Sequence, residues 1–445
     1  MKFFIHTTGC KANQWDSYII SNKLQKEGLT LCPLPYADFI IINACTLTGR
    51  AERDIKRFIN RGRSINEKAK VILAGCHAQA YPDKAFGADI ILGQNDKFHI
   101  ERFLNKEGCF VKSTRAFPME ESIINGLPEG RTRFFFKIQD GCDKFCSYCI
   151  VPYARGKSRN RPISEIIEVM KLLKKRGIKE VVLTGIEISS YKDLTTGMDL
   201  KGLLNLLEKS DTPQRIRISS IDPLYIDREF MKTIAHSKKI TKSLHIPLQS
   251  GSDRILETMG RKYSKEFIMD TVEMLKKGIE DIGIGMDVMV GFPTEDEDAF
   301  LETYRLLDTI DIYYLHIFPY SVRKGATSSS MKDDVPESIK KERAYRLKKL
   351  DINKRKVFYN RFIGKKAWII PEGKVYKGLY MRGYTDNYIP IYIPYKKGLE
   401  NNLTEVTIKG IHDNMVIGET SKQYVATPYF FKSAYFLLLS TIFGG

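Results

Sequence analysis

The sequence predicts an α/β protein built from three parts: an amino-terminal parallel α/β sheet domain, a partial (β/α)6 barrel and a small carboxyl-terminal β-barrel. Short apolar runs alternate with helical patterns as far as residue 320, which is typical of parallel sheets. After residue 366 only short strand patterns follow. A chain of 445 residues is also too long for one ordinary domain. The predicted parts are 1–115, 130–355 and 356–422, followed by a tail, 423–445.

The first part alternates strand and helix patterns. Helices are predicted at 13–27 and 49–61, and strands at 2–5, 38–43, 71–74 and 89–92. Strands that alternate with helices form a parallel sheet covered on both faces, and ligands of such sheets gather at the carboxyl ends of the strands. We therefore expect functional side chains along that edge.

Three cysteines stand at equivalent strand ends in this part. Cys10, Cys45 and Cys76 each follow a predicted strand, and Cys10 and Cys76 also follow a glycine, which lets the backbone approach a bulky ligand. Strand-end cysteines are often only packing residues. The three could therefore be core thiols, or they could form a three-cysteine cluster site in addition to the cysteine loop described below. Cys32 and Cys109 lack this setting and are expected to be inert buried thiols.

The second part holds six strand patterns, at 134–138, 180–183, 215–219, 243–246, 282–290 and 313–318. Functional groups of such a barrel sit on the loops that follow the strands. Polar or turn-forming residues occur there, namely Glu187, Ser220, Gln249, Ser250, Asp287 and Gly291. Each alone is ordinary barrel chemistry. Together they predict a ligand site at the carboxyl ends of the strands.

A cysteine loop follows the first strand of this barrel. Cys142, Cys146 and Cys149 have the spacing Cys-x3-Cys-x2-Cys. Thiolates select zinc, copper(I) or iron–sulfur clusters, and both structural zinc and an ordinary cubane cluster take four ligands. Three cysteines without a nearby fourth ligand predict an iron–sulfur cluster with one iron left open. An incomplete zinc knuckle and three unrelated buried cysteines are the alternatives.

The third part begins with a basic stretch. Residues 338–366 are rich in Lys and Arg but contain only two acids, Glu342 and Asp351. Both a solvated linker helix and a phosphate-contacting element fit this pattern, and the shortage of acids favours the second. Strands are then predicted at 367–370, 378–383, 388–393 and 404–411. Side chains that could stack on bases if exposed, or face the core instead, are Tyr380, Arg382, Tyr384 and Tyr388.

The composition indicates which kind of partner the protein binds and in which cell compartment it is expected. The net charge of +18 and the pI near 9.3 point to a polyanionic partner, RNA above all, although a basic surface can also serve solubility alone. The chain starts with no signal-peptide pattern and has no apolar run near the ~20 residues of a membrane span. We expect a cytoplasmic protein without membrane contact, with reduced cysteines. The apolar run 434–443 is expected to be a docked tail segment.

The cysteine loop resembles the core of the methylthiotransferases, a family of radical S-adenosylmethionine (SAM) enzymes. The run that carries the resemblance is KIQDGCDKFCSYCIVPYARG, residues 137–156. Further similar motifs lie at 8–13, 43–46, 75–79, 245–252 and 315–321, and residues 383–388 resemble a TRAM domain. The chain looks closest to the bacterial branch that acts on threonylcarbamoyladenosine in tRNA, and the resemblance covers residues 2–419.

The resemblance implies the cofactors. A SAM-binding 4Fe-4S cluster would be held by Cys142, Cys146 and Cys149. An auxiliary 4Fe-4S cluster that carries the sulfur would be held by Cys10, Cys45 and Cys76. SAM would act both as radical source and as methyl donor, because the hydrogen on carbon 2 of adenine is not acidic and a radical must remove it. The implied contacts of SAM are Glu187, Ser220, Gln249, Ser250, Asp287 and Gly291.

The resemblance also implies the reaction and the partners. The expected activity is transfer of a methylthio group to carbon 2 of N6-threonylcarbamoyladenosine at position 37 of tRNA. Expected partners are the tRNA anticodon stem-loop and an electron donor such as flavodoxin or ferredoxin, with the protein a monomer. Rival enzymes are the methylthiotransferases of isopentenyladenosine in tRNA and of a ribosomal-protein aspartate. A rival of another class is an RNA-binding iron–sulfur sensor, against which the barrel and its strand-end residues argue.

Overall fold

The amino-terminal part is a parallel sheet, as predicted, and it has six strands where four were predicted. The computed structural model describes residues 1–46, 49–113, 119–120, 122, 124, 132–332 and 334–420, so the tail 423–445 lies outside the described residues. The sheet order is β2-β1-β3-β4-β5-β6. Its strands are β1 (Lys2–Thr7), β2 (Thr30–Leu31), β3 (Phe39–Ala44), β4 (Lys70–Gly75), β5 (Ile90–Leu92) and β6 (Gly108–Phe110). Every residue of β3 is buried, which explains its unbroken apolar run.

Helices cover this sheet, and α1 (Lys11–Lys26), α2 (Gly49–Ile65) and the short α3 (Cys76–Ala80) begin at the edge where the strands end. This part also has the 3-10 turns η1 (Leu34–Tyr36) and η2 (Asp96–Arg102). The short edge strands β2 and β6 were missing from the predicted set. Cys109 lies in β6 and is exposed, so the expectation of a buried thiol there was wrong, because an edge strand leaves one side of the sheet uncovered.

The middle part is an open barrel of six parallel strands. One sheet has the order β11-β10-β7 and the other β12-β13-β14, and single bridges from Ile216 to Ile240 and from Ser220 to His245 join them. The strands are β7 (Arg133–Lys137), β10 (Glu180–Thr184), β11 (Arg215–Ile218), β12 (Ser243–Gln249), β13 (Gly283–Val290) and β14 (Tyr314–Pro319). The predicted partial (β/α)6 barrel is thus confirmed.

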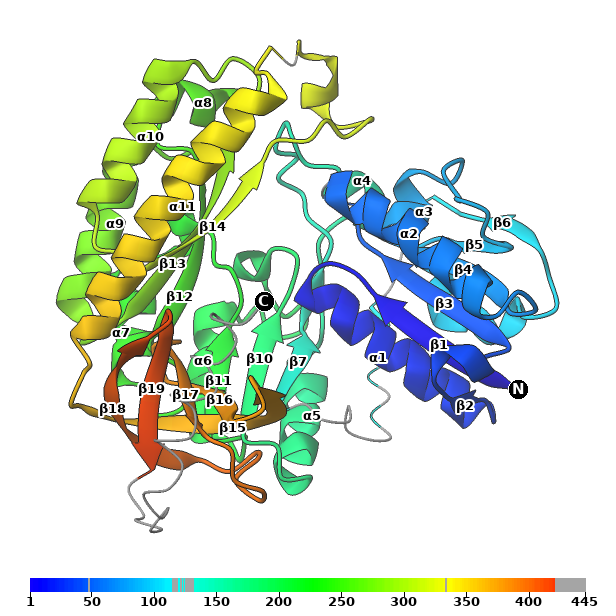
Figure 1. Ribbon diagram of the computed structural model, residues 1–445, viewed down its shortest axis with the longest axis horizontal. Coiled ribbons are helices and arrows are strands. Elements are labelled where there is room, and N and C mark those ends of the chain that lie inside the picture. The colour runs from blue at the N-terminus through cyan, green and yellow to red at the C-terminus, as the bar shows by residue number, and fades with distance from the viewer. Residues whose placement is uncertain are drawn as a thin grey trace, which may run out of the picture.

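Helices enclose the outside of this barrel. They are α5 (Ile163–Lys175), α6 (Leu200–Lys209), α7 (Arg228–His236), α8 (Asp253–Thr258), α9 (Lys265–Gly278), α10 (Glu297–Thr309) and α11 (Glu337–Asn360). Short 3-10 turns add η3 (Ile188–Ser190), η4 (Pro223–Tyr225) and η5 (Thr327–Ser330). After β7 the chain forms β8 (Gln139–Asp140), which pairs with β9 (Arg159–Asn160). Along the chain, the cysteine loop and the short helix α4 (Val151–Arg155) lie between these two paired strands. The amino-terminal sheet faces the open side of the barrel (Figure 1).

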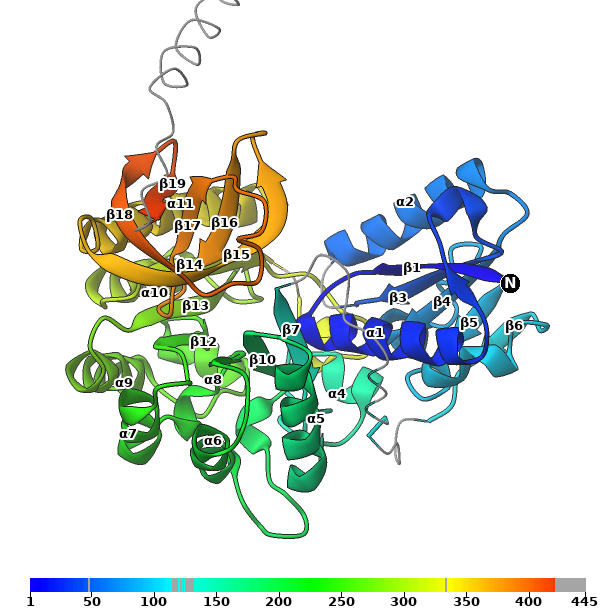
Figure 2. The same ribbon diagram turned by 90° about the horizontal axis from the view of Figure 1, so that it is seen from below.

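The carboxyl-terminal strands close into a small barrel of order β15-β16-β17-β19-β18. They are β15 (Lys366–Tyr376), β16 (Tyr380–Tyr384), β17 (Pro390–Pro394), β18 (Thr404–His412) and β19 (Met415–Thr420). This barrel sits against the large one (Figure 2). Arg217 in β11 fixes the contact by donating to the carbonyls of Thr385 and Asp386, at 3.1 Å each. The predicted boundary at 355/356 falls inside α11, which packs on β14.

The basic helix α11 and the residue that follows it have acidic partners outside their own stretch of sequence. Arg343 pairs with Glu295 at 2.8 Å, and Arg361, just after the helix, pairs with Asp311 at 2.8 Å. These acids belong to the barrel, so a count of acids within the stretch misses them. The phosphate-contact interpretation assumed that these cations lack acidic partners, and for them this assumption was wrong.

None of the helices in the described part of the chain combines the length and the apolar character that a membrane span requires.

Candidate functional site

All three parts of the protein line one cavity of about 580 Å³. Cys10 and Lys11 come from the amino-terminal sheet, Cys149 from the cysteine loop, and Tyr388 from the small barrel. The inner face of the large barrel supplies the rest of the wall, from the first residue of β13, Gly283, to strand-end residues such as Gln249. Each predicted cysteine group therefore contributes one cysteine, Cys10 or Cys149, to the wall of one cavity.

The cysteine loop is held in a fixed shape by its backbone. Gly141 has a φ of 76°, and a Cβ there would lie 2.0 Å from the carbonyl oxygen of Lys157, so only glycine fits. Burial raises the pKa of Cys142 to about 11 and that of Cys149 to about 12, and the nearby Cys146 adds to both shifts. The three thiols thus lie close together and must lose protons when they bind metal.

The second cysteine group also converges at the sheet edge. A Cβ on Gly9 would lie 2.7 Å from Cys45 Sγ, and Gly9 and Gly75 both have a φ above 90°. Burial raises the pKa of the Cys10 thiol, and Cys76 is close enough to raise it further. The prediction that Cys10, Cys45 and Cys76 meet is supported by these contacts. A Cβ on Gly75 would lie 2.4 Å from Asn43 Oδ1, so the two glycines allow the strand ends to pack closely around the thiols.

The spacing of the sulfurs fits clusters better than single ions. In neither cysteine group do all three sulfurs lie within 4.8 Å of one another. Tetrahedral zinc, with Zn–S bonds of about 2.3 Å, needs its sulfurs less than about 4 Å apart. In a 4Fe-4S cluster each cysteine binds a different iron, so the sulfurs stand farther apart. The zinc-knuckle alternative is therefore the poorer fit.

Arg155 connects the two cysteine groups. It lies at the end of α4, six residues after Cys149, and its Nε donates to Cys76 Sγ at 3.2 Å. Its other nitrogens donate to Asp140 Oδ1 at 2.8 Å and to Asp16 Oδ2 at 2.9 Å. Gln94 donates to Cys76 Sγ as well, at 3.0 Å. Such donors stabilise a thiolate that is bound to metal and influence its redox potential.

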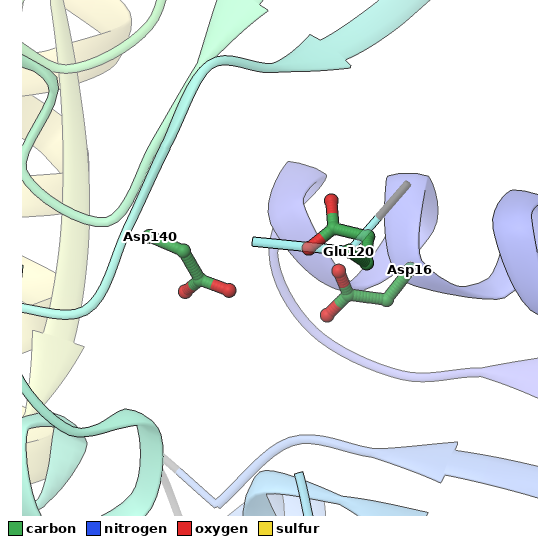
Figure 3. Close-up of side chains that lie close together, drawn as sticks. All are labelled: Asp16, Glu120 and Asp140. Carbon is green, nitrogen blue, oxygen red and sulfur yellow. The ribbon is translucent and has the colours of Figure 1, made fainter. Parts of the chain in front are cut away.

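Three buried carboxylates lie beside Arg155 and turn toward one another: Asp16, Glu120 and Asp140 (Figure 3). Their spacing alone would suit a metal ion. However, the Lys137 ammonium contacts all three, at 2.5, 3.0 and 2.7 Å, and so occupies the position where an ion would bind. Burial alone would raise the pKa of Asp16. The three cations beside it outweigh burial and hold this pKa well below its ordinary value; they are Lys137, Lys97 and Arg155. This cluster joins α1 to the large barrel.

Replacing Asp16 with alanine is expected to destabilise the protein by about 3–5 kcal/mol, because buried cations lose their partner. The pKa of Asp16 is depressed, so its contribution is present above an unfolded-state pKa of about 3.9 and is lost as the pH falls further. Urea unfolding of the wild type and the variant measures the loss of stability at neutral pH and shows whether the difference shrinks at acidic pH. Asp211→Ala, at a surface pair with Lys174, is the control and should change little. Equal midpoints for the two variants would contradict this role.

The predicted SAM contacts divide into two groups. Ser220, Gln249 and Asp287 line the cavity. Gln249 Oε1 and the neighbouring Ser219 Oγ are buried with no hydrogen-bond partner among the described residues, which indicates that a ligand supplies one. Asp287 accepts hydrogen bonds within the wall, from His245 at 3.0 Å and His316 at 2.7 Å.

The other predicted contacts are used inside the protein. Glu187 pairs with Lys144 of the cysteine loop at 2.8 Å, and the same lysine reaches Asp222 at 2.5 Å. Ser250 is fully buried against Thr303. The Gly291 amide donates to Glu295 at 2.6 Å. The structure does not bring Ser250 or Gly291 to the cavity.

Sequence reasoning missed three residues of the site, namely Lys11, Arg155 and Tyr314. It named Tyr388 but did not predict that this side chain lines the cavity. Tyr380, Arg382, Tyr384 and Tyr388 are all half-buried, not exposed. Tyr384 and Tyr388 stack at 4.6 Å, and the Arg133 guanidinium lies over Tyr384. The motif that contains Lys11 was visible, but the residues that surround its side chain, such as Arg217 and Tyr388, come from parts of the chain over a hundred residues away.

Two family models match the chain. The one described as the radical SAM superfamily covers residues 136–307, and the one described as uncharacterized protein family UPF0004 covers residues 2–93. These spans contain the two cysteine groups, one in each. A solved structure of the radical SAM methyltransferase TsrM from Kitasatospora setae, with cobalamin and a 4Fe-4S cluster bound, matches with a TM-score of 0.52 over 72% of this chain and 74% of that chain. At 14% identity this likeness shows the fold alone.

Curated relatives match along nearly the whole chain. The threonylcarbamoyladenosine tRNA methylthiotransferase MtaB of Aquifex aeolicus is 38% identical over 88% of this chain and 96% of its own length. The enzyme of the same name from Thermotoga maritima is 37% identical over 86% and 89%. The tRNA-2-methylthio-N(6)-dimethylallyladenosine synthase of Protochlamydia amoebophila is 32% identical over 94% and 96%. With such identity over almost all of both chains, this protein belongs to the radical SAM methylthiotransferase family.

Proposed function

We propose that the protein transfers a methylthio group to carbon 2 of N6-threonylcarbamoyladenosine at position 37 of tRNA, giving 2-methylthio-N6-threonylcarbamoyladenosine. The observation that carries this proposal is the meeting of two cysteine groups at one cavity. Relatives named for this substrate are 33–38% identical to the chain, and relatives named for dimethylallyladenosine are 32–34% identical. The two highest identities, 38% and 37%, belong to the first group and favour threonylcarbamoyladenosine over the isopentenyl substrate.

Each cysteine group is assigned one 4Fe-4S cluster in this proposal. Cys142, Cys146 and Cys149 would hold the cluster that binds SAM, and Cys10, Cys45 and Cys76 the auxiliary cluster. Bound there, the clusters and SAM supply the radical, the methyl group and the sulfur that the reaction needs. The close approach of Gly9 to Cys45, and sulfurs that in neither group all lie within 4.8 Å of one another, support this assignment.

The protein's own residues position and enclose the reactants. The unpartnered Gln249 Oε1 would accept a hydrogen bond from SAM, and the Ser219 hydroxyl would donate one to it. Ser220 and Asp287 line the same cavity. Tyr388 lines the cavity on the side of the small barrel. A base that enters beside it would be held in place and would displace water from the reacting groups.

The tRNA would approach from the side of the small barrel. The net charge of +18 supports an RNA partner, and the stacked Tyr384 and Tyr388 offer aromatic faces near the cavity. The proposal also includes a monomer that receives electrons from flavodoxin or ferredoxin.

Mass spectrometry of tRNA nucleosides from a strain that lacks this gene tests the substrate. We expect 2-methylthio-N6-threonylcarbamoyladenosine to disappear and N6-threonylcarbamoyladenosine to accumulate. The wild-type gene should restore the product, and a Cys142→Ala gene is the matched control that should not. Unchanged 2-methylthio-N6-threonylcarbamoyladenosine, with loss of the methylthio isopentenyl nucleoside or of ribosomal-protein modification, would refute the assignment.

A further inference from the structure

Lys11 stands out among the charged groups of the cavity. Three lysine or arginine side chains line it: Lys11, Arg217 and Arg323. Arg217 is bound by Glu180, Ser243 and the backbone of the small barrel, and Arg323 is bound by Glu52 and Ser321. The Lys11 ammonium has no hydrogen-bond or ion-pair partner among the described residues. It is the cavity's cation that is left for a ligand.

The neighbours of Lys11 come mainly from the side of the cavity where the small barrel meets the large one, although Asp287, one of the predicted SAM contacts, is also near it. The charged or ionisable groups around it include Tyr388, Arg133, Arg217 and Asp287. Tyr388 belongs to the small barrel, whose Asn387 carbonyl lies against Gly283 at the start of β13. The Cys142 loop, by contrast, follows β7 at the carboxyl ends of the strands. Lys11 therefore faces the half of the cavity that is available to the nucleotide.

The chemistry of the substrate explains a cation at this place. In adenine, carbon 2 and the amino-bearing carbon 6 both adjoin nitrogen 1, so whatever holds the N6 substituent must lie close to the reacting carbon. Lys11 directly follows Cys10, a proposed ligand of the auxiliary cluster. The threonylcarbamoyl group ends in a carboxylate, whereas an isopentenyl group is uncharged and apolar.

Resting on the proposed function, we propose that Lys11 binds the carboxylate of the threonylcarbamoyl group and thereby selects this substrate. A base that is taken into a closed pocket carries its N6 substituent with it, while its phosphates stay on the nucleic-acid backbone outside. An apolar substituent placed against the Lys11 ammonium would strip water from the charge without supplying an anion, so Lys11 would both attract one substrate and reject the other.

Binding of three matched anticodon stem-loops tests this without changing the protein. The reconstituted, unreduced wild-type protein with SAM is titrated with RNAs that carry threonylcarbamoyladenosine, its threonyl methyl ester, or plain adenosine. The acid should bind about 10- to 100-fold more tightly than the ester, as expected for a charge-assisted hydrogen bond. Equal affinity for acid and ester would overturn the proposal.

Variants then assign the effect to one side chain. Lys11→Met should remove the difference between acid and ester, and Lys11→Arg should keep most of it. Lys26→Met, on the exposed end of the same helix, is the matched control and should leave the difference unchanged. Iron content and thermal melting of each variant show whether the clusters and the fold are intact.

The remaining outcomes are decisive. If Lys11→Met weakens all three RNAs equally, Lys11 contacts the RNA backbone and the proposal is wrong. If acid and ester still differ in this variant, another cation binds the carboxylate and it is also wrong. Failure of the proposed function would look different: the wild-type protein with SAM and reductant would methylthiolate isopentenyladenosine RNA and leave threonylcarbamoyladenosine RNA unchanged.

Discussion

Replacing Cys10, Cys45 and Cys76 together with alanine is expected to abolish methylthio transfer while SAM is still cleaved to 5′-deoxyadenosine. These thiols belong to the amino-terminal sheet, and the Cys142 loop is fixed by contacts of its own, such as the hydrogen bond from the Ser147 amide to the Met259 carbonyl at 3.0 Å. The proposed sulfur-carrying cluster is therefore lost and the SAM-binding one kept. Both products are measured in one anaerobic reaction with reductant and RNA.

The chain supplies matched controls for this variant. Cys109 lies in the same sheet and Cys32 directly follows its strand β2, but neither lines the cavity, and replacing both with alanine should leave both products unchanged. Methylthiolated nucleoside formed at the wild-type rate by the triple variant would show that these cysteines do not carry the sulfur. Loss of 5′-deoxyadenosine as well would show that the two cysteine groups are not separable.

Replacing Cys142, Cys146 and Cys149 with alanine is expected to reduce both products to background. Without these thiolates SAM has no cluster beside it, and the hydrogen on carbon 2 is not acidic enough for any side chain of the cavity to remove as a proton. Binding of the RNA should persist, because the residues proposed to meet it, Lys11 and Tyr388, lie elsewhere in the cavity wall. Measurable 5′-deoxyadenosine from this variant would contradict the assignment of the loop.

The sequence was enough to predict the fold because its signals are local. An apolar run such as Phe39–Ala44 must be a strand buried on both faces, and repeated alternation with helices leaves few topologies. The placement of Cys10, Cys45 and Cys76 at one edge followed from the same rule, since parallel strands end on the same side. Strand ends also located Gln249 and Asp287 in the cavity.

The misses have a common physical origin in long-range pairing. The acids that neutralise Arg343 and Arg361 lie far away in sequence, so a local count of charges misjudged α11. Arg155 reads as an ordinary surface arginine until the fold places it against Cys76. Ser250 and Gly291 are at strand ends as predicted, but neighbouring side chains take their polar groups.

The most direct test of two clusters facing one cavity is the iron and sulfide content of the anaerobically reconstituted protein and its two triple variants. Two 4Fe-4S clusters predict about eight irons per chain in the wild type and about four in each variant. Four irons in the wild type, with no loss on replacing Cys10, Cys45 and Cys76, would contradict the account.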